Sequence, residues 1–493
     1  MAEAYLNYIG GRWIPAQSGG TFESRNPAHP SEIIGVFPRS VAVDVKNAIA
    51  AAEEAHKAWR LVPAPHRGDV VLKASMIIER RKEELSVLMT REMGKVLTEA
   101  RGDVQEAIDM GKYIAGEGRR FTGQTVPSEL RDKFAMLIRD SIGVVGLITP
   151  WNFPLAIPSW KIFPALLCGN GIVFKPAEDT PTVATVFVQI LEEAGVPPGV
   201  LNLVHGFGPE AGQPLLEDPR VRMISFTGSS DVGRLVAEEA GKRLKRVSLE
   251  LGGKNAIVVM EDADVDLVVD GALWGGFGTS GQRCTASSRL IVHQGIANRV
   301  TEALVERVRT LKVGDGLDPT VQVGPVINRE QLDRVHSYTA VGTKEGARLL
   351  TGGKILSDQL DNGHFYAPTL FDKVEPTMRI AQEEIFGPTV GITSVTDFDH
   401  ALEVANGTEY GLSLAIYTKD IDRAFRAIRD LQSGLVYVNA PTIGAEIQLP
   451  FGGIKGTGNG HREAGFSAIE QFSELKSVYI DYSGKLQRAQ IDV

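Results

Sequence analysis

The fold is decided by the stretch "GVVGLITPWNFPLAIPSWKIFPALLCGNGIVFK", residues 143–175. It opens with a short apolar run, continues through an apolar segment of helical length at 157–168, and closes with a second short run at 171–175. Short apolar runs that alternate with helical segments are typical of parallel strands covered by helices on both faces. This stretch therefore predicts an α/β fold built on a parallel sheet.

The same alternation continues towards the carboxyl end and restarts near residue 254, which predicts a second α/β unit. Further elements are expected as helices at 180–195, 229–244, 264–278 and 297–311, and as strands at 200–206, 221–227 and 288–293. Helical spacing over 67–93, ended by Gly94, predicts one long helix. The segments 133–140 and 475–484 are expected to form exposed edge strands outside both units, where subunits could pair.

Composition limits the class of protein. A chain of 493 residues exceeds what one hydrophobic core normally serves, so two or more domains are expected. The net charge of −9 gives no basic footprint for nucleic acid, and two cysteines cannot form a disulfide scaffold. Neither a signal peptide nor an apolar run of the ~20 residues that cross a membrane is recognisable. We expect a soluble, cytoplasmic protein without membrane partner or metal site.

Cys284 stands in "GQRCTASSR", residues 281–289, among small polar residues and without a neighbouring histidine. A thiol is a useful nucleophile only as the thiolate, whose formation is favoured by backbone N–H groups and positive charge. Small neighbours allow both backbone and substrate to approach it. Cys284 is therefore a candidate nucleophile, and the alternative is an inert structural cysteine.

Glu250 and Asn152 offer matching chemistry. In "VSLELGGKN", residues 247–255, Glu250 lies between leucines, where desolvation should raise its pKa towards the range of a general base. Asn152, in "TPWNFPLAIPSW", follows a strand and could donate its amide hydrogens to an oxyanion. A paired structural carboxylate and a turn asparagine are the alternatives.

Two strand-to-helix loops are candidates for binding a dinucleotide. "FKPAED" places Lys175 and Glu178 after a strand, and "FTGSSDVG" places Gly228, Ser229 and Gly233 at a helix start. A helix start with small residues accommodates a diphosphate, and a carboxylate accepts ribose hydroxyls. Capped turns without a ligand look much the same.

In this order, and together with "GGRW", "GFGPEAG", "EEIFGP" and "PFGGIKGTGNGHREAG", these stretches resemble the aldehyde dehydrogenase superfamily over nearly the whole chain. The resemblance implies a Rossmann-variant NAD-binding domain of residues 1–118 and 141–252 and an α/β catalytic domain of residues 253–451. It also implies a small oligomerisation β-extension of residues 119–140 and 467–493. A homo-oligomer is expected, with a tetramer favoured over a dimer.

The resemblance also implies residue roles. Cys284 is the nucleophile, Glu250 the general base, and Asn152 forms the oxyanion hole with the backbone N–H of Cys284. The implied cofactor contacts are Trp151, Lys175, Glu178, Gly208, Pro209, Gly212, Gly228, Ser229, Gly233, Leu251, Glu384 and Phe386. The implied substrate contacts are Phe153, Ile157, Trp160, Arg283, Thr285 and Phe451.

The implied reaction is the oxidation of a small-molecule aldehyde to its carboxylic acid through a thioester that Glu250-activated water hydrolyses. Relatives that transfer the acyl group to coenzyme A lack this glutamate. Glu178 favours NAD, with NADP as a second possibility. The expected substrate is a carboxylated semialdehyde, such as 2-oxoglutarate or succinate semialdehyde, with Arg283 either pairing with the distal carboxylate or fixing its own loop.

The alternatives are an apolar aldehyde as substrate, a thiol hydrolase or acyltransferase without a redox step, and a non-catalytic member of the same fold.

Overall fold

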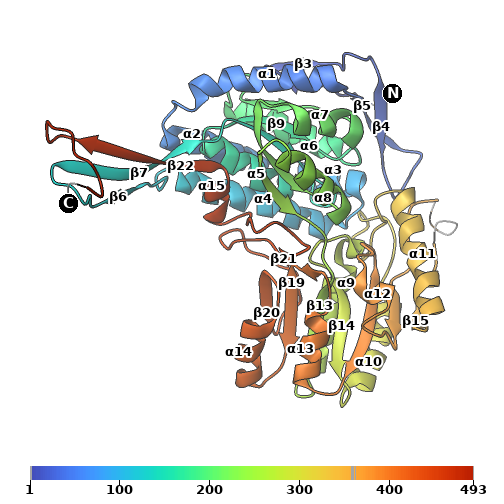
Figure 1. Cartoon of the computed structure of the whole chain (residues 1–493). Helices are drawn as coiled ribbons and strands as arrows, with labels where there is room; N and C mark the ends of the chain where they lie inside the picture. Colours follow the sequence, from blue (N-terminus) through green and yellow to red (C-terminus); the bar gives the residue numbers. More distant parts are fainter. Residues whose placement is uncertain (1–2, 357–359, 361, 492–493) are drawn as a thin grey trace.

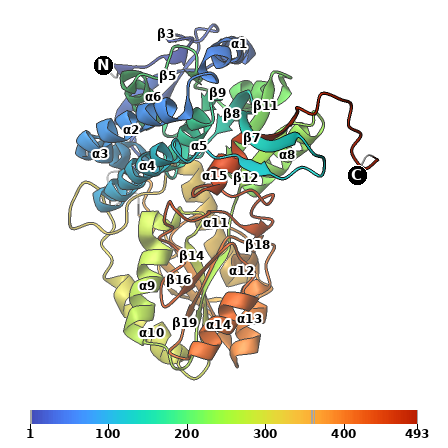
Figure 2. The same cartoon turned by 90° about the vertical axis from the view of Figure 1, so that its left-hand side faces the viewer.

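The computed structural model describes residues 3–356, 360 and 362–491. Two α/β units lie one above the other, and a three-stranded arm projects from the side of the upper unit (Figure 1). When the molecule is turned by 90°, the arm points towards the viewer and lies in front of the upper unit (Figure 2).

The upper unit contains a seven-stranded sheet in which β12, β11, β8, β9 and β10 run parallel, while β2 joins antiparallel to β10. In spatial order its strands are β12 (Arg246–Glu250), β11 (Val221–Thr227), β8 (Val144–Ile148), β9 (Gly171–Lys175), β10 (Leu201–Leu203), β2 (Asn7–Ile9) and β3 (Arg12–Ile14). Its helices are α1 (Ala42–Trp59), α2 (Ala64–Arg80), α3 (Lys82–Met93), α4 (Leu97–Glu117), α5 (Ala156–Leu167), α6 (Pro181–Ala194), α7 (Gln213–Glu217) and α8 (Ser230–Gly241), with the π-helical turn η1 (Gly208–Gly212).

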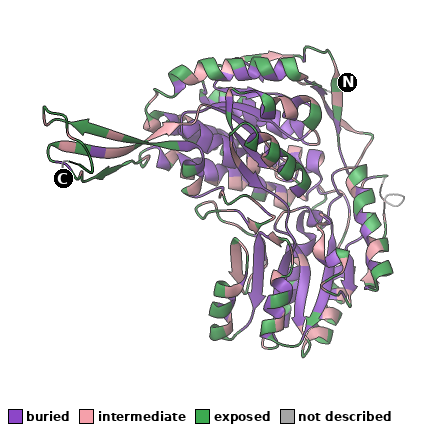
Figure 3. Ribbon diagram, in the orientation of Figure 1, coloured by how far each residue is buried: buried purple, intermediate pink, exposed green. Residues whose placement is uncertain are grey.

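Both faces of this sheet are covered. In β8, Val145 and Leu147 join the core beneath α2, α4, α5 and α6, whereas Val144 and Ile148 pack with α1, α7 and α8. The central strand β9 is buried over its whole length, and its neighbour β8 is buried in all but its last residue (Figure 3). The parallel sheet predicted from 143–175 is therefore confirmed, because a strand flanked on two faces is apolar throughout.

The lower unit repeats the architecture, as the restart near residue 254 predicted. Its strands, in spatial order, are β15 (Arg348–Thr351), β16 (Thr369–Asp372), β17 (Thr389–Val395), β14 (Ser287–His293), β13 (Asn255–Val259), β19 (Ser413–Tyr417) and β20 (Leu435–Val438). Its helices are α9 (Val265–Phe277), α10 (Ala297–Arg309), α11 (Arg329–Glu345), α12 (Arg379–Gln382), α13 (Phe398–Asn406) and α14 (Ile421–Asp430), with the 3₁₀ turn η2 (Gly278–Gly281). Two small sheets, β1 (Glu3–Ala4) with β5 (Ile33–Pro38) and β4 (Thr21–Arg25), and β18 (Tyr410–Gly411) with β21 (Ile454–Lys455), complete the fold.

The arm consists of β6 (Gln124–Val126), β7 (Lys133–Ser141) and β22 (Ser473–Asp481), which pair antiparallel. The expectation of two edge strands needs correction, since β7 is the middle strand and only β6 and β22 lie at edges. Residues 467–471, expected to belong to an oligomerisation strand, instead form the helix α15 (Ser467–Gln471) against α5. Residues 492 and 493 of that expectation lie outside the described residues.

The prediction of a single helix over 67–93 was also wrong, since two helices, α2 and α3, cover this stretch. Arg81 leaves helical geometry, with φ −101° and ψ 15°, and separates α2 from α3. Its guanidinium binds Glu84 at 3.0 Å, and neither glycine nor proline marks the break.

Among the described residues, no helix is long and apolar enough to cross a membrane, and no group of three acidic, histidine or cysteine side chains is placed to hold a metal.

Candidate active site

A cavity of about 210 Å³ lies at the carboxyl ends of β8, β11 and β12, where ligands collect in open parallel sheets. Residues of both units meet there. The cavity is lined by Pro150, Trp151, Asn152, Ile157, Thr227, Gly228, Ser229, Leu251, Gly252, Cys284, Gln331, Arg334, Glu384 and Phe386.

Cys284 enters this cavity from the loop between α9 and β14. Asn255, the first residue of β13, donates its side-chain amide to the carbonyls of Cys284 at 2.7 Å and Ala286 at 3.0 Å. A side chain at Gly253 would stand 2.6 Å from the Cys284 carbonyl, so only glycine allows this approach. The backbone of Cys284 is thus held in place at the wall of the cavity, and the residue is half-buried there.

The free protein holds Cys284 as a neutral thiol. Desolvation raises its pKa well above the ordinary value, and the charges of Glu250 and Glu384 raise it further. The backbone N–H groups of Thr285 and of Cys284 itself act in the opposite direction. Nucleophilic use of this thiol therefore requires a further positive charge or a proton acceptor nearby.

Asn152 lines the same cavity as Cys284. Its buried side chain donates from Nδ2 to the carbonyl oxygen of Gln282 at 3.1 Å. One amide hydrogen is thereby anchored to the loop of Cys284, and the second stays available to a ligand at the thiol. Its Oδ1 finds no hydrogen-bond partner in the described part of the chain.

Glu250 ends β12 and is 3 % exposed, yet neither carboxylate oxygen has a hydrogen-bond partner among the described residues. A side chain at Gly452 would lie 2.4 Å from its Oε1. Burial raises the pKa of Glu250 well above the ordinary value, and the neighbouring Glu463 raises it further. Lys161, which forms a buried ion pair with Glu463, acts against this rise. An unpartnered carboxyl with a raised pKa suits a general base.

Six of the twelve expected cofactor contacts line the cavity: Trp151, Gly228, Ser229, Leu251, Glu384 and Phe386. The rings of Trp151 and Phe386 meet edge to face at 5.4 Å. Glu384 accepts the N–H of Gly253 at 2.9 Å, and burial raises its pKa to about 7. A carboxyl group and a pair of aromatic rings therefore line the same cavity.

The other six lie outside that cavity. Lys175, at the end of β9, binds Glu178 at 2.9 Å. Gly208, Pro209 and Gly212 belong to η1, which follows β10, the parallel neighbour of β9. Gly233 lies within α8, where a Cβ would stand 2.3 Å from Leu251. Ser229 caps the same helix and accepts the N–H of Val232 at 3.4 Å.

The six expected substrate contacts do not share one cavity. Ile157 lines the cavity of Cys284, whereas Phe451 lines an adjacent one of about 390 Å³ that also contains Tyr437, Gly444 and Glu446. Trp160 meets Phe451 edge to face at 5.0 Å. Phe153, Arg283 and Thr285 line neither cavity.

Arg283 binds its own surroundings. Its Nε donates to the hydroxyl of Thr279 at 2.9 Å, and its Nη2 contacts Glu99 at 3.2 Å. This geometry favours the second interpretation of Arg283, in which the side chain fixes its own loop.

Gln331 and Arg334 line the cavity but were not anticipated. Gln331 donates to the carbonyl of Phe386 at 2.7 Å, and Arg334 donates to that of Glu384 at 2.7 Å. Both residues lie on α11. No local sequence motif surrounds them, so their place in the cavity could not be predicted from the sequence.

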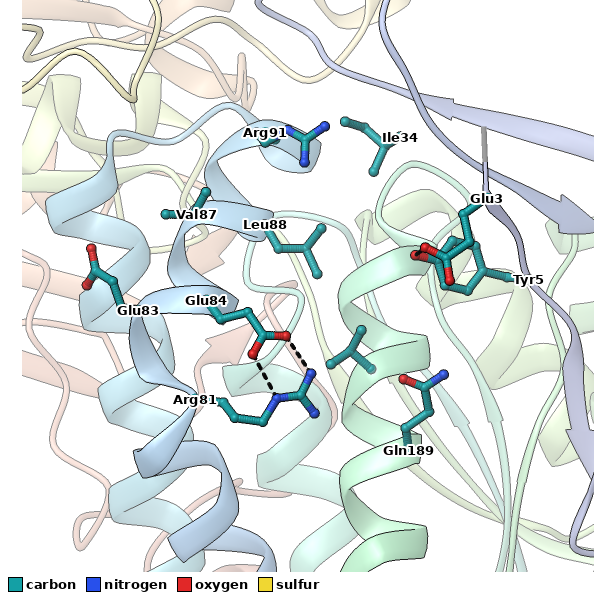
Figure 4. Close-up of a pocket in the computed structure, with 11 residues that line it drawn as sticks. Glu3, Tyr5, Ile34, Arg81, Glu83, Glu84, Val87, Leu88, Arg91 and Gln189 are labelled. Carbon is teal, nitrogen blue, oxygen red and sulfur yellow. Dashed lines mark hydrogen bonds and ion pairs between the residues drawn. The ribbon is translucent and has the colours of Figure 1, made fainter. Parts of the chain in front are cut away.

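A larger cavity of about 710 Å³ lies between α3, α6 and β1 (Figure 4). Arg81 and Glu84 pair with each other at its wall, and Arg91 pairs with Glu32. None of the expected site residues lines it, and its cations are already neutralised.

Comparison with known proteins is consistent with this geometry. The family model described as "Aldehyde dehydrogenase family" matches residues 13–478. The chain belongs to the aldehyde dehydrogenase family. It is 43 % identical to the alpha-ketoglutaric semialdehyde dehydrogenase of Bacillus subtilis (strain 168), covering 97 % of this chain and 98 % of that one.

Two solved structures have the same fold. A crystal structure of betaine aldehyde dehydrogenase from Staphylococcus aureus in complex with NAD⁺ matches with a TM-score of 0.96 and 35 % identity, covering 98 % of this chain and 95 % of that one. An NADP-dependent enzyme of E. coli matches with a TM-score of 0.94 and 37 % identity, covering 97 % of this chain and 98 % of that one. The expected aldehyde dehydrogenase fold is thereby confirmed.

Proposed function

We propose that this aldehyde dehydrogenase oxidises a semialdehyde to its acid with NAD as the hydride acceptor. One observation carries the proposal: Cys284, Asn152 and Glu384 line a single cavity. The unpartnered Glu250 carboxylate is close enough for its charge to raise the pKa of the Cys284 thiol. Nucleophile, oxyanion donor and base are the groups that acyl chemistry through a thioester needs.

The residues present fit a nicotinamide dinucleotide. Glycines at 228 and 252 leave no room for a side chain, since a Cβ would stand 2.5 Å from Phe226 and 2.4 Å from Glu384, respectively. Glu384 would hold the nicotinamide ribose, the capped start of α8 the diphosphate, and Lys175 with Glu178 the adenosine ribose. A carboxylate at Glu178 repels a 2′-phosphate, which favours NAD over NADP.

When bound, the oxidised nicotinamide supplies a hydride acceptor and a positive charge that favours the thiolate. The Cys284 thiolate attacks the aldehyde carbon, and the Asn152 amide with the Cys284 N–H holds the oxyanion. Loss of hydride from that carbon leaves an acyl thioester on Cys284. Glu250 then removes a proton from water, and the hydroxide attacks the thioester and breaks its C–S bond. The carboxylic acid leaves, and Glu250 returns the proton to the Cys284 thiolate.

The semialdehyde is inferred from the similarity to the Bacillus subtilis enzyme. Arg283 is paired with Glu99, so a distal carboxylate would have to use its remaining N–H donors. A neutral aldehyde is the competing substrate, since Trp160 and Phe451 form an apolar wall.

We propose that the protein is a homo-oligomer, with a tetramer favoured, and two kinds of surface support this proposal. The exposed face of α14 carries Ile421, Phe425 and Ile428, each more than half exposed. Beside it β20 is the outer strand of its sheet, and β22 is an outer strand of the arm. Open edges and a contiguous apolar face are what a second copy would cover.

We further propose residues 1–118 and 141–252 as the cofactor domain and 253–451 as the catalytic domain.

The deciding experiment follows NADH at 340 nm with 2-oxoglutarate semialdehyde, succinate semialdehyde and a neutral aldehyde of similar length, each with NAD and with NADP. We expect a higher kcat/KM for the semialdehydes with NAD, and no signal for Cys284→Ala. Equal turnover by Cys284→Ala would overturn the assignment.

A thiol hydrolase without a redox step is the second candidate, because a thioester-forming cysteine could serve it. It predicts ester cleavage without NADH formation and no thermal shift with either dinucleotide.

A further inference from the structure

We propose that helix α4 sets the distance between the nucleophile and the oxyanion donor, with Glu99 holding the loop of Cys284 and Asp103 holding the loop of Asn152. Both would be positioning residues, since each acts through a neighbouring segment. The inference rests on the proposed roles of Cys284 and Asn152.

The loop before Cys284 has a conformation that its sequence does not favour. Thr279, Ser280 and Gly281 have φ values of 52°, 56° and 68°. Left-handed backbone is costly for residues with a side chain, and two of these three are not glycine. At Gly281 a Cβ would stand 2.1 Å from the carbonyl oxygen of Gly387, which fixes the closeness of approach there. Such a turn persists only when its surroundings hold it.

Glu99 supplies that hold from outside the loop. Its two carboxylate oxygens accept the N–H of Thr279 at 2.9 and 2.8 Å, and one accepts the Thr279 hydroxyl at 3.3 Å. The other oxygen pairs with Arg283 at 3.2 Å. At Gly278 a Cβ would stand 2.8 Å from this carboxylate. One half-buried carboxylate therefore binds the strained turn at both ends.

Asp103 performs the matching task one helical turn later. Residues four apart on a helix share a face. Asp103 accepts the N–H of Ala156, the first residue of α5, at 2.8 Å, and binds Lys95 at 2.9 Å. Asn152 lies only four residues before this contact. The side chains of Asp103 and Lys95 are both fully buried.

The contacts made by Glu99 and by Asp103 are linked through the ring of Phe153. Lys95 Nζ lies 3.9 Å from its ring centre, and Arg283 Cζ lies 5.5 Å from it. The cation that partners each carboxylate thus contacts the same aromatic ring. Because one helix carries both carboxylates, the 3.1 Å contact from Asn152 Nδ2 to Gln282 O depends on α4.

The test uses Glu99→Ala in the full-length protein, with active sites counted from the rapid burst of NADH. We expect turnover per active site to fall by one to two orders of magnitude, as for a misplaced reacting group. The Kd for NAD, followed by tryptophan fluorescence, should stay within about twofold because Glu99 lines no part of the cavity of Cys284.

Two double variants then separate loop strain from loss of a side chain. Glu99→Ala/Thr279→Gly and Glu99→Ala/Thr279→Ala both lack the Thr279 hydroxyl, but only glycine adopts positive φ without cost. We expect the glycine variant to recover about fivefold in turnover per site relative to the alanine variant. Glu83→Gln, which removes an exposed ion pair with Arg101 of α4, should behave as wild type.

Unchanged turnover per site in Glu99→Ala, or equal rates for the two double variants, would overturn the inference. Retained activity in Cys284→Ala would instead overturn the proposed function. Should Glu99→Ala fail to fold, Glu99→Gln keeps one acceptor and allows the same comparison with the Thr279 variants.

Discussion

At the scale of single residues, the site depends on a carboxyl that the fold leaves without partners. Glu250 is buried without a hydrogen bond from the described residues, and its pKa is raised. Such a group costs stability when ionised, yet it is a stronger base than an exposed carboxylate. The same burial therefore bears on both turnover and unfolding.

For turnover, we expect Glu250→Gln to retain a single burst of NADH while steady-state kcat falls on the order of 10²- to 10⁴-fold. In the proposed reaction, thioester formation requires Cys284 and Asn152, whereas thioester hydrolysis requires Glu250 as the base. Stopped-flow absorbance at 340 nm separates the two phases. Full steady-state turnover in this variant would show that another group activates the water.

For stability, the sign follows from the raised pKa. The folded state binds the Glu250 proton more tightly than the unfolded state, so the free energy of unfolding falls as pH rises from the unfolded pKa through the folded one. Glu250→Gln should match wild type at low pH and have the higher Tm at alkaline pH, by about 1 °C for each kcal/mol recovered in a chain of 493 residues. Thermal unfolding at both ends of that range checks this, and a constant difference would contradict it.

Glu384 gives a third expectation, because burial raises its pKa to about 7. Below this pH the carboxyl is protonated and loses an acceptor for ribose hydroxyls, so the affinity for NAD should rise as pH increases through 7. Glu384→Gln should weaken binding about tenfold at pH 8 and abolish this dependence. Calorimetric titration with NAD at pH 6 and 8 measures both, and an unaltered slope in the variant would assign the pH effect to another group.

At the scale of elements, glycines set how closely segments approach. Within α8, Gly233 faces Leu251 of the cavity wall with no room for a Cβ, whereas nothing lies within 4 Å of a Cβ built at Gly241. We expect Gly233→Ala to lower the free energy of unfolding by about 1–3 kcal/mol through overpacking. Gly241→Ala, in the same helix, should be neutral or stabilising. Urea unfolding compares the two, and equal effects would contradict the packing argument.

The elements were predictable where local pattern and tertiary packing agree. Between 143 and 260, buried strands are apolar on both faces and helices begin near a proline or a small capping residue, so their positions follow from the sequence. The break at Arg81 was not predictable, because the helical spacing of apolar residues continues across it. The helix α15 was missed for a related reason: five residues give too short a pattern.

Within the site, the motifs indicated Cys284 and Asn152, which the structure brings into one cavity, but they did not indicate the groups that hold these loops from a distance. The catalytic roles themselves stay predictions. Glu99 lies 185 positions before Cys284 and contacts the loop of Cys284 only because the fold brings α4 next to that loop. The paired state of Arg283 depends on that same contact and could not be decided from sequence.

At the scale of the whole molecule, α14 supplies the test of assembly. Phe425 is 65 % exposed between Ile421 and Ile428. Phe425→Glu should shift the protein towards smaller species in light scattering coupled to size exclusion, since a charge on a covered apolar face is costly. Leu61→Glu, which alters a residue that is 74 % exposed on the upper unit, is the matched control. Identical masses for Phe425→Glu and wild type would remove α14 from the interface.

The return of β22 to β7 has a consequence for synthesis. Ser473–Asp481 pairs residue by residue with Lys133–Ser141, and Glu463 is the buried partner of Lys161. A nascent chain leaving the ribosome therefore exposes the upper unit long before the strand and the carboxylate that complete it. Until then Lys161 lacks its ion-pair partner Glu463, and the arm lacks its strand β22. The upper unit can therefore be completed only after the last residues of the chain have been made.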